Sequence, residues 1–165
     1  DKIGAEFEKG TLFLPQLIMS AGVAQAAFEV IRKHMVMSDN APVSKGKIVI
    51  ATVKGDVHDI GKNIVKVLLE NYGYDVIDLG KDVEYQAVVD AIRDNDVKLC
   101  GLSALMTTTL VSMKETIALI RENNLDCKVM VGGAVLTPEY AKEIDADFYA
   151  KDAKESVDIA KRVLG

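Results

Sequence analysis

The chain has 165 residues, with 20 Lys and Arg side chains against 25 Asp and Glu, and a formal net charge of −5 at pH 7. This length predicts one domain of ordinary size with a small appendage. The two signs of charge are scattered without a basic run, so no nucleic-acid partner is expected. No apolar stretch approaches the roughly 20 residues that span a membrane, and no signal peptide opens the chain. A cytoplasmic protein without a membrane partner is predicted.

Residues 1–36 combine helix formers with apolar residues at helical spacing and contain no β-branched strand run. Two helices with a break around Gly10 are predicted. Because Asp1 begins inside the first of them, the sequence indicates a fragment or a processed form. The polar stretch 37–46 is predicted to be a linker. It separates the helical segment from an α/β domain over residues 47–165.

Five β-branched runs alternate with helical patterns after the linker. Strands are predicted at 48–53, 75–79, 99–103, 128–131 and 148–150, and helices at about 61–72, 84–95, 109–124, 137–144 and 153–164. Apolar strands that are each followed by a helix predict a parallel sheet covered on both faces. With five strands, a flavodoxin-like (Rossmann-like), doubly wound α/β arrangement is favoured. Such sheets bind ligands beyond the carboxyl ends of their strands, so the loops after Val53, Ser103 and Val131 are the candidate functional loops.

The first of these loops reads Gly55-Asp56-Val57-His58-Asp59-Ile60-Gly61. A metal-ligating imidazole usually donates its other N–H to a carboxylate, and Asp56 is suitably placed to accept from His58. One histidine cannot form a zinc site, but it can supply an axial ligand to a metal that a macrocycle already holds. Gly61 leaves space for a flat ligand. The alternative is that Asp56 or Asp59 caps a helix and His58 is an ordinary polar loop residue.

Two further loops follow strands at the same edge of the predicted sheet. The third strand leads into Ser103-Ala-Leu105-Met-Thr107-Thr108-Thr109, in which any of the threonines could instead be a helix N-cap. The fourth leads into Gly132-Gly133-Ala134, which could be an ordinary turn. Three such loops at one edge favour a shared ligand site. Cys100 and Cys127 have no CxxC pairing and are predicted to be buried, reduced thiols.

With Asp56-x-His58-x-x-Gly61, Ser103-x-Leu105 and Gly132-Gly133 in this order, the chain resembles the B12-binding domains of methyltransferase corrinoid proteins and of cobalamin-dependent methionine synthase. In the helical segment, Phe13-Leu14-Pro15-Gln16 is similar to a motif in the last helix of the four-helix cap over the cobalt's upper face. About two of the four cap helices are present, so the resemblance implies a partial cap.

The resemblance implies that the cofactor is cobalamin or a related corrinoid, in the methylcobalamin and cob(I)alamin forms. It binds base-off with His58 as the lower axial ligand of the cobalt, and its nucleotide tail enters a slot between the sheet and its helices. Thr109 hydrogen-bonds the carboxylate that orients the histidine, where methionine synthase has serine. The implied cofactor-binding residues are Gly55, Asp56, Val57, His58, Asp59, Ile60, Gly61, Ser103, Leu105, Thr107, Thr109, Gly132, Gly133, Ala153 and Phe13.

The resemblance further implies a methyl carrier with two partners. A substrate-specific methyltransferase methylates cobalt(I), an acceptor methyltransferase removes the methyl group, and a reductive activator is a further expected partner. No residue resembles a general base acting on a substrate, so the chain is interpreted as a corrinoid subunit and not as a complete enzyme.

Two other cobalamin proteins could share the three loops. The first is the small subunit of an adenosylcobalamin-dependent isomerase, against which the cap-like helix argues. The second is a cobalamin-based sensor, which would need an effector such as a DNA-binding helix pair. Two nucleotide-related alternatives fail on residues: Gly55 to Asn63 has the wrong spacing and chemistry for a P-loop, and Leu102-Ser103 stands where a phosphoacceptor receiver domain has Asp.

Overall fold

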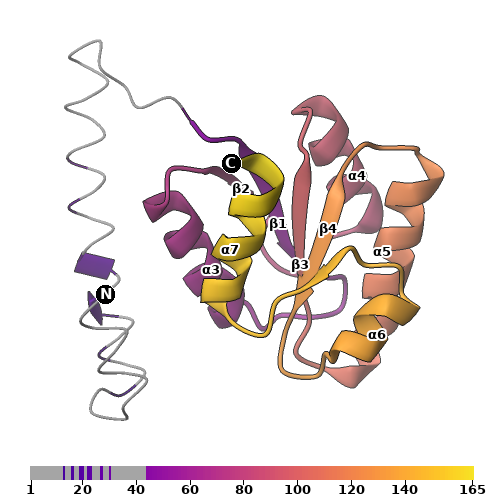
Figure 1. Ribbon diagram of the computed structural model, residues 1–165. Helices are drawn as coiled ribbons and strands as arrows, with labels where there is room; N and C mark the ends of the chain where they lie inside the picture. Colours follow the sequence, from indigo (N-terminus) through magenta and orange to yellow (C-terminus); the bar gives the residue numbers. More distant parts are fainter. Residues whose placement is uncertain are drawn as a thin grey trace. The chain divides into compact units, whose positions relative to one another are not determined.

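The structure is a computed structural model (Figure 1). It describes residues 44–165 throughout and, among the first 43 residues, Phe13, Gln16, Met19, Ser20, Gly22, Val23, Ala27 and Val30. The chain divides into two compact units, which we call the N-terminal unit (Asp1–Val43) and the α/β unit (Ser44–Gly165).

The described residues of the N-terminal unit from Gln16 to Val30 are helical. Phe13, which is not helical, exchanges two hydrogen bonds with Gln16: its N–H donates to Gln16 Oε1 and its carbonyl accepts from the Gln16 N–H, both at 2.9 Å. Such reciprocal bonds satisfy backbone groups that the first turn of a helix leaves open. The predicted break around Gly10 lies outside the described residues.

The α/β unit is built on one sheet in which all neighbouring strands are parallel. The strand order β2-β1-β3-β4-β5 is that of a flavodoxin-like fold, so the predicted doubly wound sheet is confirmed. The strands are β1 Lys47–Thr52, β2 Asp75–Asp78, β3 Leu99–Ser103, β4 Lys128–Gly132 and β5 Phe148–Tyr149. The helical elements are α3 Ile60–Asn71, α4 Tyr85–Asp94, the 3-10 turn η1 Thr107–Thr109, α5 Leu110–Glu122, α6 Pro138–Glu143 and α7 Ala153–Leu164.

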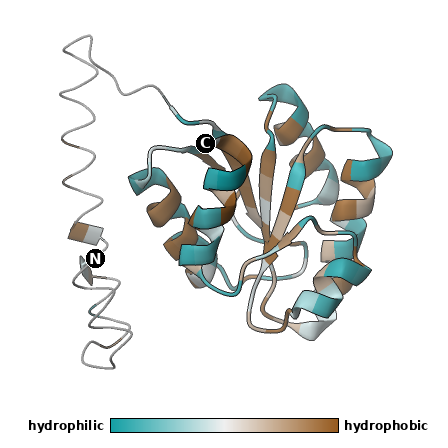
Figure 2. Ribbon diagram, viewed as in Figure 1, coloured by the Kyte–Doolittle hydropathy of each residue, from teal (hydrophilic) through white to brown (hydrophobic). Residues whose placement is uncertain are grey.

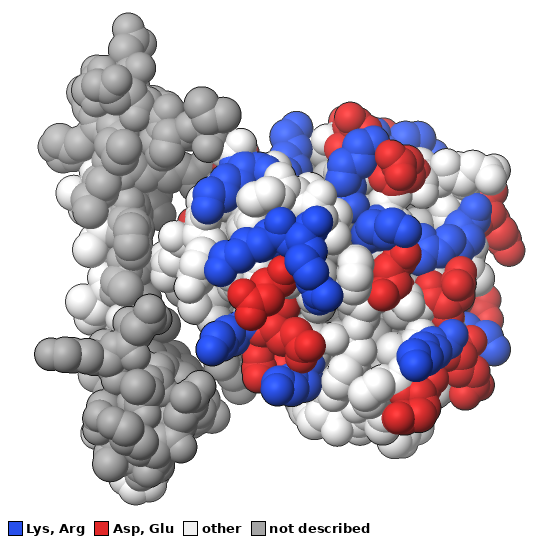
Figure 3. Space-filling model, in the orientation of Figure 1, with Lys and Arg blue, Asp and Glu red and all other residues white. Residues whose placement is uncertain are grey.

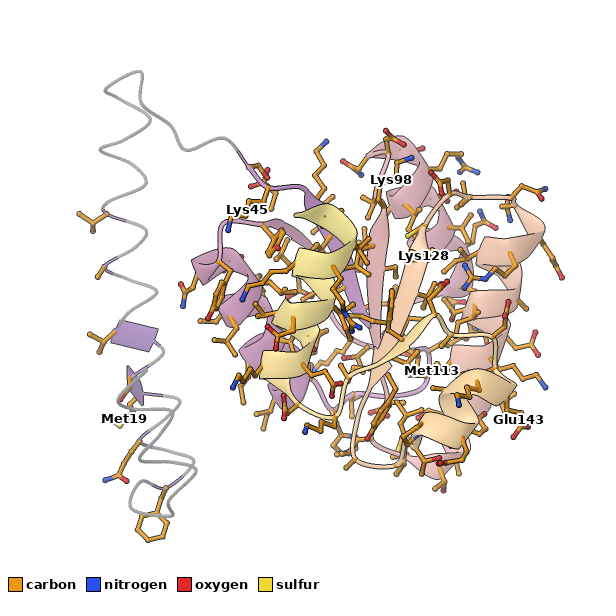
Figure 4. All side chains as sticks on the ribbon, viewed as in Figure 1. Met19, Lys45, Lys98, Met113, Lys128 and Glu143 are labelled. Atoms are coloured by element: carbon orange, nitrogen blue, oxygen red, sulfur yellow. The ribbon has the colours of Figure 1, made fainter. Side chains whose placement is uncertain are left out.

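Each face of the sheet is covered by its own layer of helices. Alternate strand residues point to opposite faces: Val49 and Ala51 pack with residues of α4, α5 and α6, whereas Ile48 and Ile50 pack with residues of α3 and α7. Figure 2 shows the apolar strands between helices whose outer faces are hydrophilic, and Figure 4 places Met113 of α5 against the sheet. Each fully buried Ile or Val contributes roughly 1.5–3 kcal/mol to stability.

Most predicted element bounds lie within one or two residues of those observed. β3 has the predicted bounds, and β1 begins and ends one residue earlier than the predicted 48–53. The helix expected from residue 109 starts at Leu110, because Thr107–Thr109 form a 3-10 turn. The compact unit begins at Ser44, within the stretch predicted as a linker, because the Asp75 N–H donates to the Gly46 carbonyl at 2.9 Å.

Both cysteines are free and buried, as predicted. Burial raises the pKa of both thiols, that of Cys127 to about 12. Among the described residues, no helix has the length and apolar character needed to cross a bilayer. On the visible face of the α/β unit, basic and acidic side chains are interspersed (Figure 3).

The strand order brings the three candidate loops together. β2 and β3 lie on opposite sides of β1, so the chain reverses direction across the sheet at the β1–β3 boundary, where doubly wound folds bind ligands. Thr52 is registered with Ser103, and Ser103 with Gly132, so β1, β3 and β4 end side by side. Lys98 and Lys128 lie at the opposite end of the sheet (Figure 4).

Candidate functional site

Asp56 is the centre of the loop cluster at this sheet edge. Its residue is fully buried, and its carboxylate accepts five hydrogen bonds. Oδ1 accepts from the His58 N–H at 3.0 Å and lies 2.8 Å from His58 Nδ1. Oδ2 accepts from the N–H groups of Leu105 and Met106, at 2.7 and 3.2 Å, and from the Thr109 hydroxyl at 2.9 Å. One carboxylate therefore joins the loops after β1 and β3.

The hydrogen bonds keep this buried carboxylate ionised. Burial by itself raises the pKa of Asp56, but the donors from His58, Leu105 and Thr109 outweigh it and hold the pKa well below its ordinary value. An ionised Asp56 is an acceptor only, so it selects the His58 tautomer that carries its proton on Nδ1.

The second ring nitrogen of His58, Nε2, is the one that could bind a metal. In a neutral imidazole with its proton on Nδ1, Nε2 carries the lone pair that can bind a metal. The His58 side chain is 46% exposed. Among the described residues, no group of three or more His, Cys, Asp or Glu could hold a metal ion. A metal at His58 must therefore bring most of its own ligands, as a macrocyclic complex does.

Helix capping does not explain these residues. Asp59 stands at the N-cap position of α3, but its side chain makes no capping hydrogen bond. Thr109 stands at the N-cap position of α5, and its hydroxyl donates to Asp56 instead of capping the helix. The expected Thr109–carboxylate hydrogen bond is thus present, and the capping alternatives for Asp56, Asp59 and Thr109 are wrong.

Exposed apolar side chains flank His58 on both joined loops. Val57, Ile60 and Leu105 are all exposed although they are large and hydrophobic. Gly61 lies in the first turn of α3 and not in the loop, and a Cβ there would meet no atom within 4 Å. These exposed apolar side chains and the open space at Gly61 suit a flat ligand with an apolar face.

Small residues form a row across the end of the sheet, on the face covered by α3 and α7. Thr52, Ser103 and Gly132 are neighbours in register on β1, β3 and β4. Ala150 continues the row after β5: its N–H bonds to Val131, and its carbonyl oxygen would lie 3.2 Å from a Cβ at Gly132. This row is where the resemblance places the nucleotide tail, and the Thr52 hydroxyl in it is buried without a hydrogen-bond partner.

Gly133 has a reason to be glycine that is independent of any ligand. Its φ of +140° is unfavourable for other residues, and a Cβ would lie 1.9 Å from the Ala104 carbonyl oxygen. The glycine is needed so that the loops after β3 and β4 can approach each other. A larger residue at Gly133 would deform these loops, so a substitution there would not isolate an effect on the slot.

The remaining candidate residues lie around this cluster. The Gly55 N–H donates to Asp82 Oδ1 at 2.7 Å, with φ at +82°. Thr107 is exposed in η1, and Ala153 is half-buried at the start of α7. Phe13 is exposed in the N-terminal unit, so its place over the site stays a prediction.

Lys62 is explained by the fold and not by phosphate binding. Its side chain is buried in the first turn of α3, and its ammonium lies 2.5 Å from Asp78 Oδ1 and 2.9 Å from Asn63 Oδ1. Burial by itself raises the pKa of Asp78, but the hydrogen bonds from Lys62 and Gly80 outweigh burial and hold the pKa below its ordinary value. The ion pair ties the start of α3 to the end of β2, which supports the loop that carries His58.

A family model described as a B12 binding domain matches residues 46–158, and a second model with the same description matches residues 1–32. The chain belongs to the B12-binding domain family. Its cofactor is cobalamin or a related corrinoid. The site fits this group: His58, bound to Asp56 through Nδ1, has a second ring nitrogen for one axial bond, exposed apolar residues lie on or next to the two joined loops, and the unpaired Thr52 hydroxyl lies in the row implied for the tail.

Named relatives of this B12-binding chain are corrinoid proteins. It is 42% identical to dimethylamine corrinoid protein 1 of Methanosarcina acetivorans, over 99% of this chain and 78% of the relative. It is 41% identical to dimethylamine corrinoid protein 3 of Methanosarcina mazei, over 99% of both chains. Among solved structures, the methanol:cobalamin methyltransferase complex MtaBC of Methanosarcina barkeri matches with a TM-score of 0.84 at 32% identity, covering 98% of this chain and 62% of that chain.

Response-regulator structures share only the fold with this B12-binding chain. A LuxR-family regulator of Staphylococcus aureus matches 73% of the chain and 99% of its own, with a TM-score of 0.54 at 19% identity. The α/β framework therefore does not specify the ligand, and the residues after the strands must do so.

Two contributors to the cluster were not predicted. Met106 donates through its backbone N–H, for which its side chain carries no signal. Thr52 could have been recognised from strand alternation, because it ends β1 on the same face as Ile48 and Ile50. Only the register shows that it lies beside Ser103.

Proposed function

We propose that the chain is a methyl-carrying corrinoid protein that works between two methyltransferases. Support comes from relatives named dimethylamine corrinoid proteins and from the similarity to a methanol:cobalamin methyltransferase complex. The observation that carries the proposal is the Asp56–His58 hydrogen bond of 2.8 Å, which prepares one imidazole nitrogen as an axial ligand. The match to dimethylamine corrinoid proteins covers 99% of this chain, which favours a methyl carrier over an isomerase subunit.

A bound corrinoid supplies a cobalt centre that takes a methyl group in its cobalt(I) state and yields it to an acceptor. His58 Nε2 would hold the cobalt of this group, and Asp56, hydrogen-bonded to Nδ1, would orient the ring. The carboxylate itself is fixed by Leu105, Met106 and Thr109, so the axial ligand rests on two loops. This chain positions and tunes the cofactor, while the partner methyltransferases supply the substrate sites.

The remaining cofactor contacts belong to the same proposal. The exposed side chains of Val57 and Ile60 would lie against the lower corrin face, with Gly55, Asp59 and Gly61 completing the loop. Ser103, Leu105, Gly132 and Gly133 would line the tail slot, with Thr107 and Ala153 near the nucleotide. We further propose that residues 1–36 form a cap segment, 37–46 a linker and 47–165 the cobalamin-binding domain. We also propose that the protein is cytoplasmic and that a reductive activator is its third partner.

The function is tested with the full chain loaded with corrinoid and reduced to cobalt(I). It is mixed with a methyltransferase for dimethylamine, monomethylamine or methanol, each with its own substrate. We expect one of them to convert the visible spectrum to that of the methylated cofactor, and an acceptor methyltransferase then to reverse it. A chain that binds corrinoid but is methylated by none, while a corrinoid protein supplied as positive control is methylated, would contradict the proposal.

The cap proposal predicts an effect of Phe13 on cofactor lifetime. Phe13 is 72% exposed within the described residues, and a large aromatic side chain over the reactive face would exclude water and oxygen. Phe13→Ala should speed photolysis of the methylated protein several-fold at nearly constant corrinoid affinity, because the α/β loops supply the binding. The control is Val111→Ala, because Val111 is also an exposed apolar residue but lies on α5. Equal decay rates in Phe13→Ala and wild type would contradict the cap role.

A further inference from the structure

Thr52 has an unusual environment for a buried threonine. It ends β1 with 0% exposure, and its Oγ1 is, within the described part of the chain, the one buried side-chain oxygen or nitrogen without a hydrogen-bond partner. Its backbone is satisfied, because the N–H donates to the Gly80 carbonyl at 2.9 Å and its own carbonyl accepts from the Val83 N–H at 3.2 Å. Only the hydroxyl is left over.

The fold offers no reason of its own for this hydroxyl. Thr52 shares its sheet face with Ile48 and Ile50, which are buried in the apolar cluster under α3 and α7. Valine has nearly the same shape and would avoid burying an unpaired polar group. Buried polar groups in native proteins are almost always hydrogen-bonded, so an exception needs an explanation, and a ligand atom is one.

The position of Thr52 indicates which partner this is. Its register neighbour is Ser103, followed by Gly132, so two hydroxyls stand side by side in a row that contains no large side chain. The row lies at the carboxyl edge of the sheet and directly precedes the loop that carries His58. A ligand that coordinates His58 and continues over this sheet face would meet the Thr52 hydroxyl.

We infer that Thr52 is a specificity-determining residue for the nucleotide tail of the corrinoid, and that its hydroxyl hydrogen-bonds a polar atom of the buried lower base or its ribose. The inference rests on the proposed binding of the tail between the sheet and helices α3 and α7. It assigns Thr52 to the tail and not to the corrin ring or the cobalt, so its effect depends on whether the corrinoid carries a complete tail.

The test measures corrinoid affinity of the full-length chain by spectroscopic titration. The ligands are cobalamin, a cobamide with a phenolic lower base, and cobinamide, which lacks the nucleotide. Thr52→Val should weaken cobalamin binding about 5- to 30-fold and leave cobinamide binding unchanged, because one buried hydrogen bond is lost. Loss with cobalamin alone assigns the partner to the base, and equal loss with the phenolic cobamide assigns it to the ribose.

Two variants and a second measurement exclude a merely structural role. Thr52→Ser keeps the hydroxyl and should retain the preference for cobalamin over cobinamide. Thr116→Val is a matched control, because Thr116 is equally buried but its Oγ1 donates to the Ser112 carbonyl at 2.7 Å. In the cofactor-free chain, Thr52→Val should raise the melting temperature by about 2–4 °C, since an unpaired hydroxyl is removed. Thr116→Val should not raise it.

Three results would overturn the inference: an equal loss of cobinamide and cobalamin affinity in Thr52→Val, no loss for any ligand, or destabilisation of the cofactor-free chain. Failure of the proposed function is separable, because these titrations require no methyl transfer. If wild type binds cobalamin and cobinamide with equal affinity, the tail slot itself is wrong, whatever the result for Thr52.

Discussion

Replacing His58 with alanine is expected to remove the axial protein ligand of the cobalt and to lower methyl transfer about 100-fold, while the chain still retains corrinoid. Substituting a residue that hydrogen-bonds to a metal ligand typically lowers activity about 10- to 100-fold. Removing the ligand itself should have an effect at the upper end of that range. Retention is expected because the proposed tail contacts, Ser103 and Gly132, lie on other strands than the His58 loop follows. Wild-type and variant proteins are compared by cofactor content after gel filtration and by methyl-transfer rate.

The ligation itself is measured by electron paramagnetic resonance of the cobalt(II) form. In wild type carrying nitrogen-15 histidine, the superhyperfine splitting from the axial nitrogen should change with the label, and in His58→Ala the coupling should disappear. His34→Ala, at the second histidine of the sequence, is the matched control and should leave the spectrum unchanged. A splitting that ignores the label would rule out a protein ligand.

Asp56→Ala is expected to lower the free energy of unfolding of the cofactor-free chain by about 3–4 kcal/mol, more than any other substitution proposed for this chain. The substitution leaves the backbone N–H groups of His58, Leu105 and Met106 without their acceptor in a buried environment. Denaturant titration of the cofactor-free protein measures the effect. Asp59→Ala is the control and should change stability by less than about 0.5 kcal/mol, because Asp59 makes no capping hydrogen bond. If Asp56→Ala cost as little stability as Asp59→Ala, the hydrogen bonds to Asp56 would not stabilise the fold.

The same carboxylate gives stability a defined dependence on pH. The pKa of Asp56 is depressed from an ordinary value of 3.8, so its stabilising contribution is complete above that value and is lost as pH falls toward the folded-state pKa. Wild type should therefore lose stability more steeply than Asp56→Asn below about pH 4. Parallel curves for the two proteins would mean that the carboxylate is not preferentially ionised in the folded state.

The sequence by itself determined the order of elements and the sheet edge that carries the chemistry. Strand runs such as Lys47–Thr52 are apolar and β-branched, and each precedes a helical pattern, so local periodicity was enough for a parallel, doubly wound sheet. The motif around Asp56 and His58 also pointed to one axial ligand. Both signals are local, because they depend on residues close together along the chain.

His58 and Thr109 were expected as partners of Asp56, but only the tertiary structure showed its backbone partners on the loop after β3. Three of the hydrogen bonds to the Asp56 carboxylate come from residues 49 to 53 positions away along the chain. Two of these three donors are the backbone N–H groups of Leu105 and Met106, which the identity of a side chain cannot reveal. The orphaned hydroxyl of Thr52 and the requirement for glycine at 133 likewise depend on strand register and on the approach of one loop to another. Local sequence sets which groups are available, but hydrogen bonds over such separations exist only once the strands are paired.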